Sequence, residues 1–207
     1  MSRPRKDDLQ SAATTKIEAA FWRLLEEVGY SEITVRRVSQ TAGTNRNSFY
    51  YHYESLEDLA RKAFLSNAAN AYPLISSLIT GFWDGTAQPA QPDGATVEHA
   101  RRVMLCARSE SPFLRDLVGE LLRDTWFGVL GIDESLLSVD DWTQVEFIFG
   151  GLVAVLGSDG AAESPLVVAG LAASRMGRAS LDALREMAEK RSIDIVCQAV
   201  ASGVPAG

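Results

Sequence analysis

The chain is 207 residues long, enough for one large or two small domains with a buried core. Its composition, 46% hydrophobic and 23% charged residues, is ordinary for a globular protein. The longest apolar run, residues 147–157, is too short for a membrane-spanning helix, which needs about 20 residues. No apolar segment follows a basic one at the N-terminus, so the sequence predicts neither a membrane protein nor a secreted one.

The net charge of −7 is unevenly distributed along the chain. Residues 1–65 carry ten Lys or Arg against nine Asp or Glu, a balance of +1. Residues 66–207 carry ten against 18, a balance of −8. The first third of the chain is therefore the part suited to a polyanionic partner, although chance could produce the same asymmetry.

The cysteines and histidines are too few and too scattered for a disulfide framework or a zinc site. Cys106 and Cys197 lie within apolar helical patterns, and only His52 and His99 could add imidazole ligands. These features predict a reduced cytoplasmic protein that holds neither a metal nor a cofactor.

Periodic apolar residues predict four helices in the first third of the chain. The first covers residues 17–28 and ends at a glycine, and the second begins after Thr34, a suitable N-cap. The third covers residues 45–51 and is anchored by Phe49. The fourth begins after Ser55, with two acidic residues in its first turn.

The rest of the chain also carries helical patterns. Pro73 should kink or divide the next apolar region, and the glycines and prolines of residues 84–95 predict a loop. Further helices are expected over residues 97–107, after Ser111-Pro112, over 140–156, after Ser164-Pro165 and over 180–201. Because no segment alternates with the period of a strand, we expect an all-α fold of nine or ten helices.

These elements suggest three parts. Residues 1–10 form a flexible basic arm carrying Arg3, Arg5 and Lys6. Residues 11–58 form a three-helix head, and residues 59–207 form a helical bundle. The arm serves either as a solubilising tail or as an extension that enters a DNA minor groove.

Residues 34–53, TVRRVSQTAGTNRNSFYYHY, combine a helix, a glycine-bearing turn and a short polar helix. If Phe49 fills the core beneath them, the N-terminal end of the polar helix stays exposed, with backbone N–H groups that suit phosphate oxygens. Arginine pairs with guanine and asparagine with adenine, whereas tyrosine and histidine can reach phosphates. The segment therefore predicts a helix-turn-helix whose DNA-contacting residues are Thr44, Asn45, Arg46, Asn47, Ser48, Tyr50, Tyr51 and His52. The alternative for single members is structural: a solvated Arg46, or a His52 without a DNA contact.

The segment resembles the TetR family of bacterial regulators, whose signature runs T-V-x-x-I-A-x-x-A-G-V-S-x-G-T-F-Y-x-H-F-x-S-K-E-x-L. The resemblance covers about residues 12–64, and its F-Y-x-H-[FY] run is specific. The matching positions are Thr34, Val35, Val38, Ala42, Gly43, Ser48, Phe49, Tyr50, His52, Tyr53, Ser55, Glu57 and Leu59.

The resemblance implies that Thr34 and Arg36 contact the DNA backbone, that residues 45–48 enter the major groove, and that Tyr50 and His52 contact phosphates.

The chain departs from the family pattern at three positions. Asn45 and Asn47 replace the common Ser and Gly, which predicts an operator sequence particular to this protein. Leu56 stands where the family usually has a phosphate-binding lysine, so one charge-assisted contact is lost.

Residues 147–157 are apolar around the whole helix, whereas a helix that covers a monomer's core keeps a polar face. Either this helix lies at the centre of the body, or a second subunit covers it. Because helix-turn-helix proteins generally bind with two heads, we favour a homodimer. In the resembling family the last two long helices form a four-helix interface. The candidate interface residues here are Gly150, Gly151, Val155, Leu184, Met187 and Ile195.

Bulky side chains in the body could line a cavity for a small apolar effector, or could be plain core. They are Trp83, Met104, Trp126, Phe127, Trp142 and Phe149. No nucleophile, acidic-triad or phosphate-loop motif is present in the sequence, so we expect no enzymatic activity. The sequence therefore predicts a ligand-responsive repressor that binds a near-palindromic operator as a homodimer. The alternatives are a helical interaction or adaptor protein, and a constitutive DNA-binding regulator without a ligand.

Overall fold

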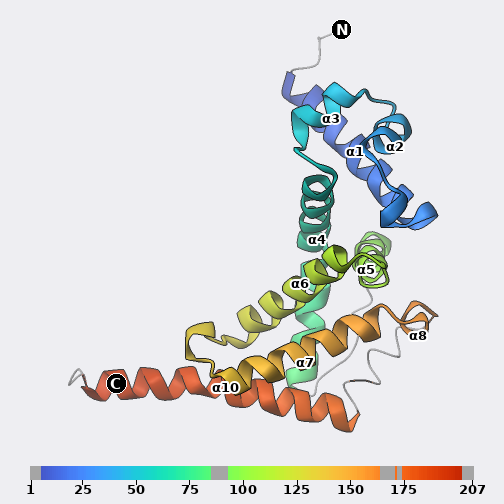
Figure 1. The fold of residues 1–207 in the computed structure, drawn as a ribbon. Coiled ribbons are helices and arrows are strands. Elements are labelled where there is room, and N and C mark those ends of the chain that lie inside the picture. The colour runs from blue at the N-terminus through green and yellow to red at the C-terminus, as the bar shows by residue number, and fades with distance from the viewer. Residues whose placement is uncertain (1–5, 85–92, 164–170, 172–173, 202–207) are drawn as a thin grey trace. The chain divides into compact units, whose positions relative to one another are not determined.

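The computed structural model describes residues 6–84, 93–163, 171 and 174–201, and every regular element within them is a helix (Figure 1). The all-α prediction is confirmed, with nine α-helices and no strand in these ranges. The chain forms two compact units. Unit 1 comprises residues 1–71 and 94–117, and unit 2 comprises residues 72–93 and 118–207.

Unit 1 contains the predicted helix-turn-helix and two later segments. Its elements are α1 (Lys6–Val28), the 3₁₀ helix η1 (Tyr30–Glu32), α2 (Val35–Thr41), α3 (Arg46–His52), the first part of α4 (Leu56–Asp84), α5 (Gly94–Ala107) and the start of α6 (Pro112–Leu130). Figure 1 shows α2 and α3 against α1, in agreement with the contacts among these three helices.

The core of unit 1 follows from the apolar periodicity of the sequence. Five large apolar side chains of this core are no more than 1% exposed: Ile17 and Phe21 on α1, Phe49 on α3, and Leu59 and Phe64 on α4. Each apolar stripe therefore faces the shared interior, where burial of a large side chain is worth about 1.5–3 kcal/mol.

The predicted boundary between head and body does not coincide with the compact units. Residue 58 lies in the first turn of α4, which continues to Asp84, and α5 joins the head through polar contacts. Arg101 of α5 donates to both carboxylate oxygens of Glu26 on α1, at 2.7 and 3.2 Å. The Asn67 Nδ2 group of α4 donates to the His99 carbonyl at 2.9 Å, and Asn67 Oδ1 lies 2.8 Å from His99 Nδ1. These contacts join residues far apart in the chain, which local patterns do not reveal.

Unit 2 contains the end of α4, most of α6, η2 (Glu134–Leu136), α7 (Val139–Leu156), α8 (Asp159–Glu163) and α10 (Arg175–Ala201). Ser138 and Asp141 form a capping box that starts α7. Asp141 also accepts a hydrogen bond from Lys190, which connects the start of α7 to the middle of α10. The hydrogen bonds of Asp141 with Lys190 and the Ser138 hydroxyl lower its carboxyl pKa to about 2.

Two expectations about helix boundaries are corrected. Of the two outcomes expected at Pro73, a division of the helix does not occur, because α4 runs from Leu56 to Asp84, and a kink stays a prediction. α10 begins at Arg175 rather than near residue 180, because the Ser174 hydroxyl accepts the Gly177 N–H and caps an earlier turn. Residues 1–5 of the predicted arm and the helix start at Ser164-Pro165 lie outside the described residues.

The described helices include none long and apolar enough to cross a membrane. Among the described side chains, no group of three His, Cys, Asp or Glu could hold a metal ion. Cys106 is fully buried on α5, and burial raises the pKa of its thiol to about 12.

Candidate nucleic-acid interface

Both helices of the helix-turn-helix begin at a capping side chain. Thr34 accepts the Arg37 N–H at 3.2 Å to cap α2, and the Asn45 side-chain oxygen accepts the Ser48 N–H at 2.8 Å to cap α3. Between them Gly43 has a φ of 66°, a conformation that glycine adopts without steric cost. These local bonds determine the direction in which α3 leaves the turn.

Phe49 holds α3 on the unit 1 core. Its ring is fully buried and lies 5.6 Å from the ring of Tyr53, itself 3% exposed. Tyr53 donates its hydroxyl to Glu18 of α1 at 3.0 Å. Burial and the neighbouring Glu18 carboxylate both raise the pKa of the Tyr53 hydroxyl, which therefore remains a donor. With one face fixed in this way, α3 presents its opposite face outward.

Four of the ten residues predicted to contact DNA are exposed on α3, and Arg36 is exposed on α2. Arg36, Arg46 and Asn47 are exposed, and Tyr50 and Tyr51 are exposed by 58% and 65%. Ser48 and His52 are half-buried. The exposed residues provide guanidinium, amide and phenol groups, which are the donors that proteins use on base edges and phosphates.

Three of the predicted contact residues have a polar atom that the domain itself uses or buries. The oxygens of Thr34 and Asn45 cap α2 and α3, so Asn45 has only its Nδ2 group left to donate. Thr44 was expected to face DNA, but its hydroxyl oxygen is buried and has no hydrogen-bond partner among the described residues. Thr44 as a whole is half-buried, and its contact with DNA stays a prediction.

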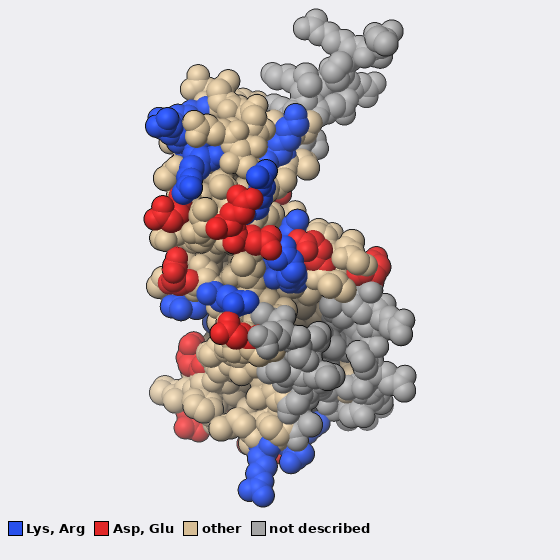
Figure 2. Space-filling model, turned by 90° about the vertical axis from the view of Figure 1, so that its right-hand side faces the viewer, with Lys and Arg blue, Asp and Glu red and all other residues tan. Residues whose placement is uncertain are grey.

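The segment that carries this face has the charge that DNA requires. Residues 33–53 contain three arginines and no Asp or Glu, in a chain whose net charge is −7. Figure 2 shows Lys and Arg side chains gathered near the top of the view, with the Asp and Glu side chains mostly below them. A local positive field of this kind attracts phosphate even when the whole protein is acidic.

The fold and charge of this region agree with a comparison to known families. Residues 17–63 match the model of bacterial regulatory proteins of the tetR family. They form a TetR-family helix-turn-helix domain. The chain therefore carries the DNA-binding domain found in this family of transcriptional regulators. No curated protein sequence gives a significant match to the chain.

The TetR-family domain contains one contact that sequence reasoning missed. The Lys62 ammonium on α4 lies 2.8 Å from Asp58 Oδ2 and 3.4 Å from the carbonyl oxygen of His52 at the end of α3. The i,i+4 spacing of Asp58 and Lys62 was visible in the sequence, but the link to His52 was not. Leu56, at the position of the usual family lysine, is half-buried.

Four of the six predicted pocket residues form an aromatic cluster in unit 2. The Phe127 ring lies 6.2 Å from Trp142 and 6.1 Å from Phe149, and Trp126 lies 6.5 Å from Phe149. The two phenylalanines are 4% exposed, whereas the two tryptophans are half-buried. Met104 belongs to unit 1, and the side chain of Trp83 lies outside the described residues.

The predicted dimer residues divide into exposed and buried groups. Gly150 and Gly151 are exposed on α7, and a Cβ atom added at either would meet nothing within 4 Å. Val155 is half-buried. Leu184 and Met187 are only 1% and 2% exposed, so they belong to the core of the protomer itself. The side chain of Ile195 lies outside the described residues.

Proposed function

We propose that this protein is a ligand-responsive repressor that acts in the cytoplasm, as a homodimer, on a near-palindromic operator. The observation that carries the proposal is the exposed face of α3. Arg46, Asn47 and Tyr50 are exposed on it and Arg36 is exposed on α2, within a segment that lacks acidic residues.

Arg46 and Asn47 are the base-reading residues of the proposal. Neither side chain has a hydrogen bond or ion pair within the described part of the chain, so both can present their full donor and acceptor sets. Arg46 suits the O6 and N7 atoms of guanine, and Asn47 suits the N6 and N7 atoms of adenine. Tyr50, Tyr51 and His52 would contact phosphates, which adds affinity without sequence preference.

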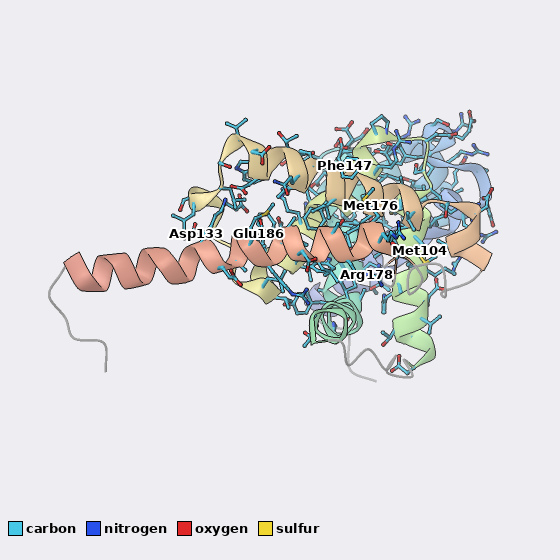
Figure 3. The ribbon with its side chains drawn as sticks, turned by 90° about the horizontal axis from the view of Figure 1, so that it is seen from below. Met104, Asp133, Phe147, Met176, Arg178 and Glu186 are labelled. Atoms are coloured by element: carbon cyan, nitrogen blue, oxygen red, sulfur yellow. The ribbon has the colours of Figure 1, made fainter. Side chains whose placement is uncertain are left out.

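The proposed dimer forms through the outer face of α7 and the start of α10. Phe147 and Met176 are 65% and 55% exposed, unusual values for large apolar side chains, and Figure 3 labels them on these two helices. Gly150 and Gly151 follow Phe147 by about one turn, so a two-fold partner could place its Phe147 over them. This arrangement replaces Leu184 and Met187, which the protomer buries itself.

The proposed effector is a small apolar molecule that binds beside Trp126 and Trp142. Their rings are half-buried at the edge of the aromatic cluster, so an apolar ligand could complete their burial. Such a ligand can release DNA only if it binds the DNA-free state more tightly, by about 1–3 kcal/mol in typical cases. The coupling must be reciprocal, so the operator must weaken effector binding by the same factor.

The experiment that tests the DNA-binding part uses DNA selected by the purified protein from a random-sequence library. We expect an approximately symmetric site, and we expect Arg46→Ala to lose about 1–3 kcal/mol of preference for it over scrambled DNA. Arg23→Ala, on exposed α1, is the matched control and should retain the preference. Equal weakening of both DNAs by Arg46→Ala would contradict base reading by Arg46.

The effector and the dimer are tested separately. Sedimentation should give a dimer at micromolar concentration, and Phe147→Glu should give a folded monomer. Compounds that raise the unfolding temperature should then be titrated into the protein, with and without operator DNA. The change in tryptophan fluorescence gives their affinity. A monomeric wild-type protein would contradict the proposed homodimer and its near-palindromic operator. Identical effector affinity with and without operator would favour a constitutive regulator.

A further inference from the structure

The base-reading end of α3 is fixed by Asn45 and Phe49, but the opposite end is held by a residue of another helix. The Lys62 ammonium, on the second turn of α4, approaches the carbonyl oxygen of His52, the last residue of α3, at 3.4 Å. The last carbonyls of a helix lack partners within it and carry partial negative charge. A cation at this position therefore stabilises the end of α3 directly.

The orientation of Lys62 is set by Asp58, one turn earlier on α4. Asp58 Oδ2 accepts the Lys62 ammonium at 2.8 Å and the backbone N–H of Glu54 at 3.0 Å. The Ser55 hydroxyl accepts the Asp58 N–H at 3.1 Å, which completes the cap of α4. The same carboxylate thus fixes both the start of α4 and the direction of the lysine.

A third contact connects this pair to the core of the domain. The Lys62 nitrogen lies 5.5 Å from the centre of the Tyr53 ring, within the range of a cation–π contact. Tyr53 is buried directly after α3 and donates its hydroxyl to Glu18 of α1. Lys62 therefore contacts the segment that links α3 to α4, and through Tyr53 it reaches α1.

We propose that Lys62 is a positioning residue for DNA recognition, which holds the C-terminal end of α3 in register with α4 without contacting DNA itself. A helix of seven residues has little stability of its own, so its orientation depends on attachments at both ends. Loss of the Lys62 attachment should leave α3 formed around Phe49 but free to tilt, which moves Arg46 and Asn47 relative to the bases. The inference rests on the proposed operator recognition.

The experiment compares Lys62→Met, Lys62→Arg and Arg23→Met in the full chain. Arg23 is the matched control, because it forms an i,i+4 pair with Glu27 at the same 2.8 Å and both partners lie on α1. Affinity for a selected operator duplex and for a scrambled duplex of the same length is measured from 50 to 300 mM salt. Circular dichroism gives the unfolding temperature of each variant.

We expect Lys62→Met to weaken operator binding about threefold to fivefold, the size of a lost cation at a helix end. Binding to scrambled DNA should change less than twofold, and the salt slope should be unchanged because no phosphate contact is removed. Lys62→Arg should restore most of the operator preference, and Arg23→Met should retain it.

Three results would overturn the inference. Equal weakening of both duplexes, with a salt slope lower by about one, would make Lys62 a phosphate contact. A fall in unfolding temperature with unchanged operator preference would make it merely structural, as would unchanged binding. Failure of the proposed function looks different: in that case the wild type itself would not prefer any selected duplex over the scrambled one.

Discussion

Both units contain apolar and polar contacts, but particular pairs of helices within each unit meet through contacts of different kinds. In unit 1, segments far apart in the sequence meet through directed polar pairs, such as Glu26 with Arg101 and Asn67 with His99. In unit 2, α6 and α7 meet through a cluster of four aromatic rings. A hydrogen bond weakens steeply when its geometry changes, whereas an apolar contact tolerates sliding and repacking.

This difference corresponds to the tasks that the two units would perform. Reading base edges requires that α3 keep one orientation, which directed contacts enforce. Admitting a small apolar molecule requires that side chains move apart at low cost, which aromatic contacts permit.

The largest effect should come from Phe49→Ala, which removes the fully buried ring between α3 and the core. We expect a loss of about 3–5 kcal/mol in the free energy of unfolding, measured by urea titration with circular dichroism. Phe149→Ala in unit 2 should cost less, because the neighbouring rings can relax into the space. Leu65→Ala, at an exposed position on α4, is the control. Equal losses in the free energy of unfolding for Phe49→Ala and Phe149→Ala would contradict the expected difference between the two units.

Asp141→Asn tests the polar connection between α7 and α10 in unit 2. The hydrogen bonds from Lys190 and Ser138 lower the pKa of the Asp141 carboxyl to about 2, so ionised Asp141 stabilises the fold. That stabilisation is complete above the unfolded pKa of about 4 and disappears as the pH falls towards about 2. We expect Asp141→Asn to lose about 1–2 kcal/mol at pH 7 and almost none at pH 2. Asp140→Asn is the control, and a loss independent of pH would contradict the ionic role.

The two asparagines of the recognition segment should have separable roles. Asn45→Ala removes the cap of α3 and should cost about 1 kcal/mol in the free energy of unfolding. Asn47→Ala should leave stability unchanged and reduce operator preference, because its side chain is exposed. Urea titration and DNA binding measure the two effects. The division of roles fails if Asn47→Ala is the destabilising variant.

Glu26→Gln weakens the pair that joins α1 to α5. Because the Glu26 and Arg101 side chains are about half exposed, we expect a loss of less than about 1 kcal/mol in the free energy of unfolding. The loss should shrink further in 1 M salt, where charges are screened within about 3 Å. Glu27→Gln, whose partner Arg23 lies on the same helix, is the control. A loss that is independent of salt would show that the charge is not what joins the two helices.

The smallest change should be a gain. The Thr44 hydroxyl is buried without a partner, so Thr44→Val should raise the free energy of unfolding by about 0.5–1 kcal/mol. DNA affinity should be unchanged if the hydroxyl stays buried when DNA binds. Thr41→Val, on the exposed side of α2, should give no gain. A loss of operator binding by Thr44→Val would support Thr44 as a DNA contact.

The sequence by itself determined the helix-turn-helix of unit 1 and the local caps that form it. The caps formed by Thr34 and Asn45 join residues three positions apart, and Phe49 follows from the apolar periodicity of its own segment. Caps and apolar periodicity depend only on residues a few positions apart, so they can be recognised in the sequence without knowledge of the fold. The sequence did not show that the Asn45 cap uses the oxygen that a bidentate adenine contact needs.

Only the tertiary structure decided which distant residues meet. Lys62 reaches the end of α3 across 10 residues of chain, and Arg101 reaches Glu26 across 75. The tertiary structure also decided the place of Met187. Its apolar pattern fits a dimer interface and a core equally well, and the protomer buries it. The physical reason is that a periodic pattern fixes one face of a helix, but the crossing of helices determines what lies against that face.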